Sequence, residues 1–488
     1  MRDGRRVVVI GGGLAGIAAA LDCAEAGARV TLLEVRRRLG GAAYSFERDG
    51  LRIDNGQHVF LRRCVAYRAL LARLGSEHGV SVQRRLEIPV LRPGAEPIRL
   101  RRNRLPAPLH LAGALARYRP LSIAQRLSAA RTALALARLD PSDRALDRLT
   151  FGDWLARHGQ GPDAVGALWD LIALPTLNLP AAQASLALGA FVFRNGLLSS
   201  ADAADIGFHT RSLSETIGEP AARALRAAGV EVRLGWRAER LERTASGFEV
   251  RGRGGRSATG EAEQGGDRQD RDGDGVQWAG ESEDSAAGGE GDGLSAEVAI
   301  VAVPHARAAT LLAQLTPTLA RRLGALGSSP IVNLHVLYDR QVCELPFAAG
   351  VGTPVQYLFD RTAAAGAPAG SQYLAVSLSA AEREMGMSVE ALRERYLPAL
   401  RRLLPRAREA KVERFLATRE HAATFRAVPG VAALRPRAET SVPGLVLAGN
   451  WTATGWPATL EGAVLSGHTA ARRALLQLGG GPRESASA

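Results

Sequence analysis

Lysine is almost absent from this 488-residue sequence, which affects how its positive charge is interpreted. Lys411 is the only lysine among 62 basic residues, so arginine supplies nearly all of the positive charge behind the formal net charge of +13. This bias is more typical of a GC-rich coding sequence than of an adaptation to nucleic acid, and we expect no nucleic-acid partner. An anionic membrane surface or an anionic ligand explains the excess charge better.

Cysteine is also scarce. Cys23, Cys64 and Cys343 are the only three, and no two of them form a C-x-x-C pair. Their odd number and their spacing argue against a disulfide framework, a zinc site and a dithiol reductase, so we predict no metal. The content of 46% hydrophobic and 23% charged residues is typical of a soluble globular protein with two or three domains.

Long uninterrupted hydrophobic runs are missing. The longest uncharged stretch covers residues 171–193, which would reach across a bilayer as one helix. Pro175, Asn178 and Pro180 interrupt it, so we predict a buried core segment in two pieces. Residues 252–293 contain 13 glycines and 11 acidic residues against four arginines. Such a composition predicts a disordered acidic insertion within a hairpin, and residues 479–488 a flexible tail.

The N-terminal residues predict a dinucleotide-binding unit. An apolar strand over 6–10 runs into G-x-G-x-x-G, a helix over 17–26 follows, and a second strand over 29–33 ends at Glu34. In such a unit the glycines allow a tight turn, close approach of a pyrophosphate and helix–strand packing, while the acid accepts hydrogen bonds from a ribose. The predicted binding residues are Gly11, Gly13, Leu14, Ala15, Gly16 and Glu34.

The next residues resemble the FAD-dependent amine oxidase and phytoene desaturase superfamily, in which a basic residue and a glycine pair follow the first βαβ unit. Here these are Arg38, Gly40 and Gly41, followed by Ala42. The resemblance implies FAD as the cofactor, with the arginine near the pyrophosphate and the glycines beside the flavin. No second G-x-G-x-x-G is present, so we expect no separate NAD(P)H domain and an external electron donor.

Two further segments resemble the same superfamily. Residues 444–463 match its closing motif, a strand and then a helix aimed at the flavin, although Asn450 replaces the usual aspartate. The resemblance assigns cofactor contacts to Gly449, Asn450, Thr459 and Leu460. Residues 229–241 resemble a hairpin over the adenine, with Ala238 at the contact position.

The resemblance implies an α/β fold in two parts. A discontinuous Rossmann-like FAD-binding domain would comprise residues 1–75, 205–251, 294–310 and 430–478. An amine oxidase-like α+β substrate domain, facing the membrane, would comprise residues 76–204 and 311–429.

The run Asp54-Asn55-Gly56-Gln57-His58 is the most informative piece, because it resembles the hydroxysqualene dehydroxylases of hopanoid biosynthesis. This resemblance implies reductive removal of an allylic hydroxyl from a C30 isoprenoid, with Gly56 beside the flavin. We expect His58 to donate the proton that lets the hydroxyl leave as water, Asp54 to orient His58, and Gln57 to hold the flavin or the substrate oxygen. A purely structural role for His58 remains open.

A squalene-sized substrate predicts a long apolar tunnel, which residues 171–193 and 331–338 are candidates to line. Arg99, Arg101, Arg102 and Arg104 precede an apolar stretch, and an amphipathic segment follows over 121–139. Basic charge beside apolar surface suits peripheral contact with the inner face of the cytoplasmic membrane, although a solvated arginine face is the alternative.

Three alternatives stay open at this point. A carotenoid-type desaturase would run the opposite, oxidative reaction on a similar polyene. An amine oxidase would usually need an aromatic cage, and aromatic residues are only 5% here. A prenyl-binding escort protein of this ancestral fold would need no flavin, and the intact glycine motifs argue against it.

Overall fold

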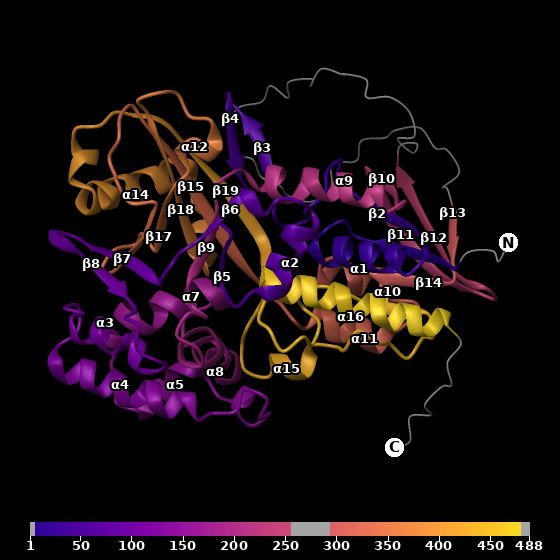
Figure 1. The fold of residues 1–488 in the computed structure, drawn as a ribbon, viewed down its shortest axis with the longest axis horizontal. Coiled ribbons are helices and arrows are strands. Elements are labelled where there is room, and N and C mark those ends of the chain that lie inside the picture. Colours follow the sequence, from indigo (N-terminus) through magenta and orange to yellow (C-terminus); the bar gives the residue numbers. More distant parts are fainter. Residues whose placement is uncertain (1–4, 255–292, 480–488) are drawn as a thin grey trace.

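A five-stranded parallel sheet forms the first part of the molecule in the computed structural model, which describes residues 5–254 and 293–479 (Figure 1). Its strand order is β10-β2-β1-β14-β20, and every neighbouring pair is parallel. The strands are β1 (Arg6–Ile10), β2 (Arg29–Glu34), β10 (Glu231–Leu234), β14 (Val298–Val301) and β20 (Leu445–Leu447). Four remote stretches of the sequence therefore build one sheet, as the α/β fold class requires.

Alternate residues of β1 face opposite layers, as the two-residue period of a strand dictates. Val7 and Val9 belong to a core shared with helices on one face, and Val8 and Ile10 to a core on the other. The first face carries α1 (Leu14–Glu25), α2 (Val65–Arg73), α9 (Glu219–Ala227) and α16 (Leu460–Leu478). The second carries α10 (His305–Leu312), α11 (Pro317–Gly324) and the sheet of β11 (Trp236–Thr244), β12 (Gly247–Gly254) and β13 (Gly293–Ala296).

Small residues bring α1 and α16 into close contact. A Cβ on Gly467 would lie 2.3 Å from the carbonyl oxygen of Ala15 and 2.9 Å from the Cβ of Ala18. Glycine at position 467 therefore lets the backbones of α1 and α16 touch on the same face of the sheet.

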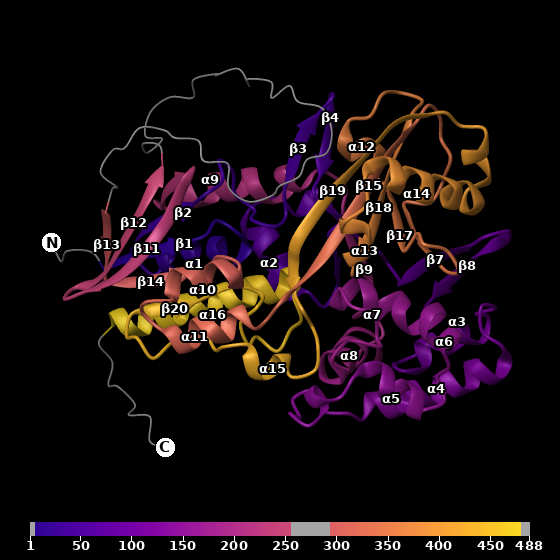
Figure 2. The same ribbon diagram turned by 180° about the vertical axis from the view of Figure 1, so that it is seen from behind.

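A mixed seven-stranded sheet forms the second part, at the opposite end of the molecule (Figures 1 and 2). Its strands in spatial order are β19 (Val412–Phe425), β15 (Ser328–Tyr338), β18 (Gln372–Ser379), β17 (Tyr357–Asp360), β16 (Phe347–Gly350), β7 (Glu87–Arg92) and β8 (Ala95–Arg101). Apolar residues of α14 (Val389–Leu403) share a core with β15 and β18. The short helices here are α12 (Thr362–Ala365) and α13 (Glu382–Met385).

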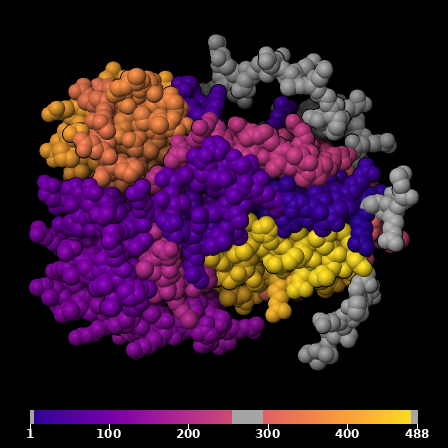
Figure 3. All heavy atoms as spheres, viewed as in Figure 1, coloured from indigo at the N-terminus to yellow at the C-terminus, as the bar shows by residue number. Residues whose placement is uncertain are grey.

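Helices fill the region between residues 105 and 200, which forms the lower left of Figure 3. They are α3 (Ala112–Ala116), α4 (Ile123–Ala137), α5 (Phe151–Arg157), α6 (Pro162–Ala164), α7 (Asp170–Leu177) and α8 (Leu186–Phe193). The prediction of a buried segment in two pieces is confirmed, because α7 ends at Asn178 with a φ of +53° and α8 begins eight residues later. Within the described ranges, no helix combines the length and apolar character needed to cross a membrane.

Two small sheets join the parts. One pairs β3 (Ser45–Arg48) with β4 (Leu51–Asp54), and the other has the order β5 (Val59–Leu61), β9 (Ile206–His209), β6 (Val80–Val82). The short α15 (Val431–Leu434) precedes the C-terminal strand. The predicted domain boundaries stay a prediction, and the one after residue 310 falls inside α10, which packs against α11.

Three expectations need correction. The 229–241 segment is not a hairpin, because β10 joins the parallel sheet and β11 pairs with β12, with Gly235 at a φ of +68° between them. The first helix starts at Leu14 rather than at residue 17. Arg102 is not part of a basic surface, because it pairs with buried Asp205 at 2.7 Å.

Most of the predicted acidic insertion lies outside the described residues, which end at 254 and resume at 293. The strands on either side of the insertion, β12 and β13, pair with each other. Residues 480–488 of the predicted tail also lie outside the described residues.

Candidate functional site

In the glycine turn after β1, close packing requires glycine at two positions and leaves open space beside a third. A Cβ on Gly16 would lie 1.9 Å from the carbonyl oxygen of Gly11, and one on Gly11 would lie 2.6 Å from that of Ala302. A Cβ on Gly13 would meet only the Cα of Gly41, at an ordinary 3.7 Å. Packing therefore explains Gly11 and Gly16, whereas Gly13 keeps a space open above the start of α1.

The start of α1 offers unpaired donors to that space. Gly13 is the N-cap of the helix and has no capping side chain. The amides of Leu14, Ala15 and Gly16 are the first of the helix and have no carbonyl four residues before them within it. Together with the positive end of the helix dipole, they make an anion-binding cradle.

Glu34 lies at the end of β2 and is buried. Its carboxylate accepts hydrogen bonds from the backbone N–H groups of Gly12 at 2.7 Å and Arg36 at 2.8 Å. Each carboxylate oxygen has a second lone pair, so the predicted contact with a ribose is compatible with these bonds. Glu34 thereby also ties the glycine turn to the end of the second strand.

The glycine pair lies directly against the turn. The amide of Gly40 donates to the carbonyl of Gly12 at 2.9 Å, and a Cβ on Gly41 would lie 2.7 Å from the Cα of Gly13. Arg38 donates to the carbonyl of Gly41 at 3.2 Å, and its guanidinium stacks 3.4 Å from the ring centre of Tyr44. Burial lowers the pKa of Arg38.

The C-terminal motif is organised by a buried arginine that the sequence analysis did not identify. Arg435 donates to the carbonyls of Asn450 at 3.1 Å and Thr452 at 2.5 Å, and it stacks on Phe425. Burial lowers its pKa to about 10, so it stays charged at neutral pH. Gly449 takes a φ of +139°, which only glycine adopts readily, and donates to the hydroxyl of Ser466 at 2.8 Å.

The start of α16 is capped by Thr459, whose hydroxyl accepts from the amide of Gly462 at 3.1 Å, and Leu460 is the first residue of the helix. The buried Glu461 reaches back to α2 and accepts from the amides of Ala66 at 3.0 Å and Tyr67 at 2.7 Å. Ala238 lies in β11, and its carbonyl accepts from Arg307 at 2.7 Å.

The 54–58 segment is held in place from both parts of the molecule. The side chain of Asn55 donates to the carbonyl of Ala42 at 2.9 Å and to Glu420 of β19 at 2.8 Å. The backbone carbonyl of Asn55 accepts from Asn333 of β15 at 2.9 Å and from Thr418 at 3.1 Å. The segment is therefore positioned between the glycine pair and the seven-stranded sheet.

Two amide atoms beside Gly56 are buried and have no hydrogen-bond partner: Nε2 of Gln57 and Oδ1 of Asn333. Asn333 is fully buried, and its Nδ2 is committed to the Asn55 carbonyl, so its Oδ1 is the atom left over. Buried polar atoms of a native protein normally have partners. The unpaired donor and acceptor therefore indicate that a polar ligand binds here.

A cavity of about 590 Å3 opens beside this segment. Gln57 and His58 line it together with the rings of Phe208, Phe347 and Phe359. Neither of the segments predicted to line a tunnel, 171–193 and 331–338, is among the residues that line this cavity. Its volume is in the usual range for small-molecule sites, and its wall combines these apolar rings with polar and charged side chains, among them Glu344 and Asp360.

His58 is half-buried, and its Nδ1 lies 3.2 Å from the carbonyl oxygen of Gly56. Burial lowers the pKa of His58 below its ordinary value of 6.5. The imidazole is therefore mostly neutral at neutral pH, and it acts as an acid only after taking up a proton.

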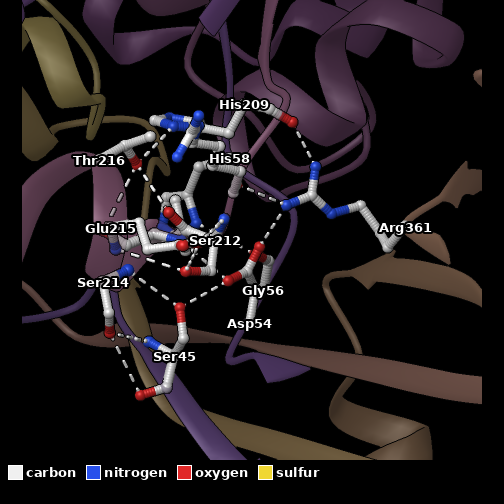
Figure 4. A network of polar contacts seen from close by, with 12 residues as sticks. Ser45, Asp54, Gly56, His58, His209, Ser212, Ser214, Glu215, Thr216 and Arg361 are labelled. Atoms are coloured by element: carbon white, nitrogen blue, oxygen red, sulfur yellow. Dashed lines mark hydrogen bonds and ion pairs between the residues drawn. The ribbon is translucent and has the colours of Figure 1, made fainter. Parts of the chain in front are cut away.

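The expectation that Asp54 orients His58 is wrong, because other groups occupy its carboxylate (Figure 4). Oδ1 accepts from the hydroxyl of Ser45 at 2.7 Å and the amide of Leu213 at 2.9 Å, and Oδ2 pairs with Arg361 at 2.7 Å. Arg361 also donates to the carbonyl of His209. Asp54 and Arg361 form a buried ion pair that ties β4 and β9 to the residue between β17 and α12, beside the cavity.

His209 is the second imidazole that lines the cavity. The hydroxyl of Thr216 donates to the carbonyl of Ser212 at 3.0 Å, so it accepts from Nδ1 of His209 at 2.9 Å. Nε2 then accepts from the hydroxyl of Tyr67 at 3.1 Å. Burial lowers the pKa of His209 to about 3, which makes it a fixed neutral group and not a proton donor.

The residues present fit FAD. The cradle at Gly13 suits a pyrophosphate, Glu34 suits a ribose, and the unpaired Oδ1 of Asn333 suits the polar edge of a flavin. The amide side chain of Asn450, predicted to contact the cofactor, has no hydrogen-bond partner among the described residues. No group of His, Cys, Asp and Glu side chains in the described part of the chain could hold a metal ion.

The sequence analysis missed Asn333, Arg361 and Arg435. Asn333 and Arg361 have their partners, Asn55 and Asp54, in remote segments, whereas Arg435 bonds to residues 15 and 17 positions further along the chain. Asn333 follows an apolar run, and a polar residue within a buried strand is the one signal that could have identified it.

Comparison with known proteins agrees with this geometry. The family model described as flavin containing amine oxidoreductase matches residues 14–264 and 268–475. A hydroxysqualene dehydroxylase of Sinorhizobium fredii is 28% identical over 96% of this chain and 98% of its own length. Another, of Rhodopseudomonas palustris, is 29% identical over 96% of this chain and 97% of its own. Among solved structures, an oxidoreductase from Methanosarcina mazei has a TM-score of 0.68 at 16% identity and covers 95% of this chain and 99% of that one.

Proposed function

Since this chain belongs to the family of flavin-containing amine oxidoreductases and binds FAD, we propose that it reduces a C30 isoprenoid alcohol. The proposed reaction removes the allylic hydroxyl of hydroxysqualene and gives squalene. The observation that carries the proposal is the full-length similarity to hydroxysqualene dehydroxylases, which spans both the cofactor motifs and the strands around the cavity. The cavity supports it in part, because the rings of Phe208, Phe347 and Phe359 give one space an apolar wall beside the polar side chains of Gln57 and His58.

The reaction breaks the C–O bond, replaces it with a C–H bond and releases water, so the substrate gains two electrons and the oxygen gains a proton. FAD, when reduced and bound, supplies the electrons as a hydride. Because nothing in the motifs indicates a second nucleotide-binding domain, an external electron donor has to supply the reducing equivalents.

The chain's own residues hold the substrate and handle the proton. Nε2 of Gln57 is a donor without a partner and suits the departing oxygen. His58 lies next to it, and in its protonated form it donates the proton that turns the hydroxyl into water. The rings of Phe208, Phe347 and Phe359 form an apolar surface beside these two side chains, against which the hydrocarbon chain of the substrate would pack.

The test is anaerobic incubation of the FAD-loaded, photoreduced protein with hydroxysqualene, followed by mass spectrometry of the lipids. Squalene is the expected product, and Gln57→Leu is expected to lower its yield. The oxidised protein is incubated in parallel with C30 and C40 polyenes. Absence of squalene together with dehydrogenation of a polyene would overturn the proposal in favour of a desaturase.

A further inference from the structure

A basic groove opens beside the cavity, and the site described above does not use it. It has a volume of about 810 Å3, and five arginines line it: Arg84, Arg85, Arg99, Arg101 and Arg104. Glu344, Pro346 and Phe347 line both the groove and the cavity. The groove and the candidate site therefore share a wall.

The acids of the groove are already engaged. Glu87 pairs with Arg99 at 2.7 Å and with Arg101 at 3.3 Å. Glu344 pairs at 2.9 Å with Arg406, which is not among the lining residues.

By contrast, no described residue accepts a hydrogen bond from the guanidinium groups of Arg84, Arg85 and Arg104. Three guanidinium forks without protein acceptors suit phosphate groups, which match their geometry.

An apolar ridge lies close to this groove. On α4, Ile123 is 71% exposed, Leu127 56% and Leu134 49%. Their spacing puts them on one face of the helix, while Ala129 and Leu136 are buried on the other. Leu105 and Leu109, which follow the groove's Arg104 in the chain, are exposed by 50% and 55%.

The groove and the ridge belong to one end of the molecule. The helix α3 packs against both β8, which carries Arg99 and Arg101, and α4. Both ribbon views place β8, α3 and α4 at the end remote from the parallel sheet (Figures 1 and 2). Residues 105–139 contain five arginines and no acidic residue, so nothing in this stretch repels an anionic surface.

We propose that the groove and the ridge together dock the protein on an anionic lipid bilayer. Phospholipid phosphates occupy the groove at Arg84, Arg85 and Arg104, and the side chains of Ile123, Leu127 and Leu134 enter the acyl region. On α4 the exposed aliphatic side chains are accompanied by the exposed Arg131, a combination that suits a segment lying in the membrane interface. Docking in this way would place the wall shared by the groove and the cavity at the bilayer surface, where an apolar substrate could pass from the bilayer to the cavity. This part of the proposal rests on the proposed function.

The test uses the full-length, FAD-loaded protein and co-sedimentation with vesicles of phosphatidylcholine, with and without phosphatidylglycerol. The variant Arg84→Gln/Arg85→Gln/Arg104→Gln is expected to bind the anionic vesicles about a hundredfold more weakly, because each arginine near the surface contributes about fivefold. The matched control is Arg223→Gln/Arg226→Gln/Arg472→Gln, which removes the same charge from the exposed faces of α9 and α16. It is expected to bind within a few fold of the wild type.

A second variant tests the ridge. Ile123→Gln/Leu127→Gln/Leu134→Gln changes only exposed positions and is expected to weaken binding at least tenfold while the salt dependence persists. A fluorophore on Leu127→Cys is expected to shift to shorter wavelength on anionic vesicles, and one on Arg226→Cys to stay unchanged. The native cysteines are buried and do not interfere.

Equal binding by the groove variant and its control would overturn the docking surface, as would equal binding to neutral and anionic vesicles. Binding of inorganic diphosphate as tight as that of vesicles would show a site for a free phosphate instead of a membrane. Turnover of hydroxysqualene in detergent micelles is measured in parallel. If the protein turns over hydroxysqualene in micelles but binds no vesicles, the docking proposal is wrong and the proposed function stands. If the protein binds vesicles but shows no turnover in micelles, the proposed function is wrong and the docking proposal stands.

Discussion

Replacement of Gly13 by alanine separates cofactor binding from folding. Gly13 has φ −78° and ψ 177°, which alanine adopts without strain. The added Cβ would meet only the Cα of Gly41, at 3.7 Å. Gly16→Ala is the matched control in the same turn, because its Cβ would lie 1.9 Å from the carbonyl oxygen of Gly11.

The magnitudes follow from these contacts. For Gly13→Ala the loss of chain entropy in the unfolded state stabilises by about 0.4–1 kcal/mol, and a poorer N-cap offsets this, so the apoprotein should change by less than about 0.5 kcal/mol. The methyl group would enter the space where the cradle would hold the pyrophosphate. Losing one hydrogen bond to a charged group costs about 1.5–3 kcal/mol, so FAD should bind roughly 10 to 150 times more weakly.

The assay combines thermal unfolding of the apoproteins with titration of FAD followed by flavin fluorescence. Gly13→Ala should melt like the wild type and bind FAD weakly, whereas Gly16→Ala should melt at a clearly lower temperature even without FAD. Wild-type affinity of Gly13→Ala for FAD, or a loss of apoprotein stability as large as that of Gly16→Ala, would refute the assignment of the cradle.

Three further predictions concern the site. Asp54→Asn should destabilise the protein by about 3–5 kcal/mol in urea unfolding, because it leaves the Arg361 charge buried, and the loss should be smaller when Arg361→Gln is added; additive effects would argue against the pair. Because burial lowers the pKa of His58 below 6.5, dehydroxylation should speed up as the pH falls through that pKa, and His58→Gln should abolish this rise; a rise that persists in the variant would contradict the role of His58. Asn333→Leu removes the unpaired acceptor and should weaken FAD binding about tenfold and shift the flavin absorption band, whereas Thr418→Val, which also loses a hydrogen bond to the Asn55 carbonyl, should change neither.

The features predictable from sequence are those encoded by neighbouring residues. The apolar run into Gly11 and the acid at Glu34 predicted the first βαβ unit, because turn geometry and strand pattern are local. Asn178 and Pro180 predicted the break between α7 and α8 for the same reason, whereas Pro175, also expected to interrupt the segment, lies inside α7. The resemblance to a flavoprotein superfamily supplied the cofactor and the subfamily, and both agree with the family match.

The errors concern partners that lie far apart in the chain. Asp54 was expected to serve His58, four residues away, yet its carboxylate pairs with Arg361, 307 residues away. The 229–241 segment was expected to be a hairpin, yet β10 joins a strand from the N-terminus. Proximity in sequence is a poor guide here, because a buried charge takes the partner that removes its desolvation cost.

The sequence by itself determined the cofactor class and the local form of its cradle, because glycine conformations and helix ends depend on a few consecutive residues. Only the tertiary structure decided which polar groups have hydrogen-bond partners within the protein and which are left unpaired for a ligand. It committed Asp54 and His209 to internal partners and left Gln57 and Asn333 unpaired beside Gly56. Hydrogen-bond satisfaction is a property of the assembled chain, since a donor has no partner until folding brings one within reach.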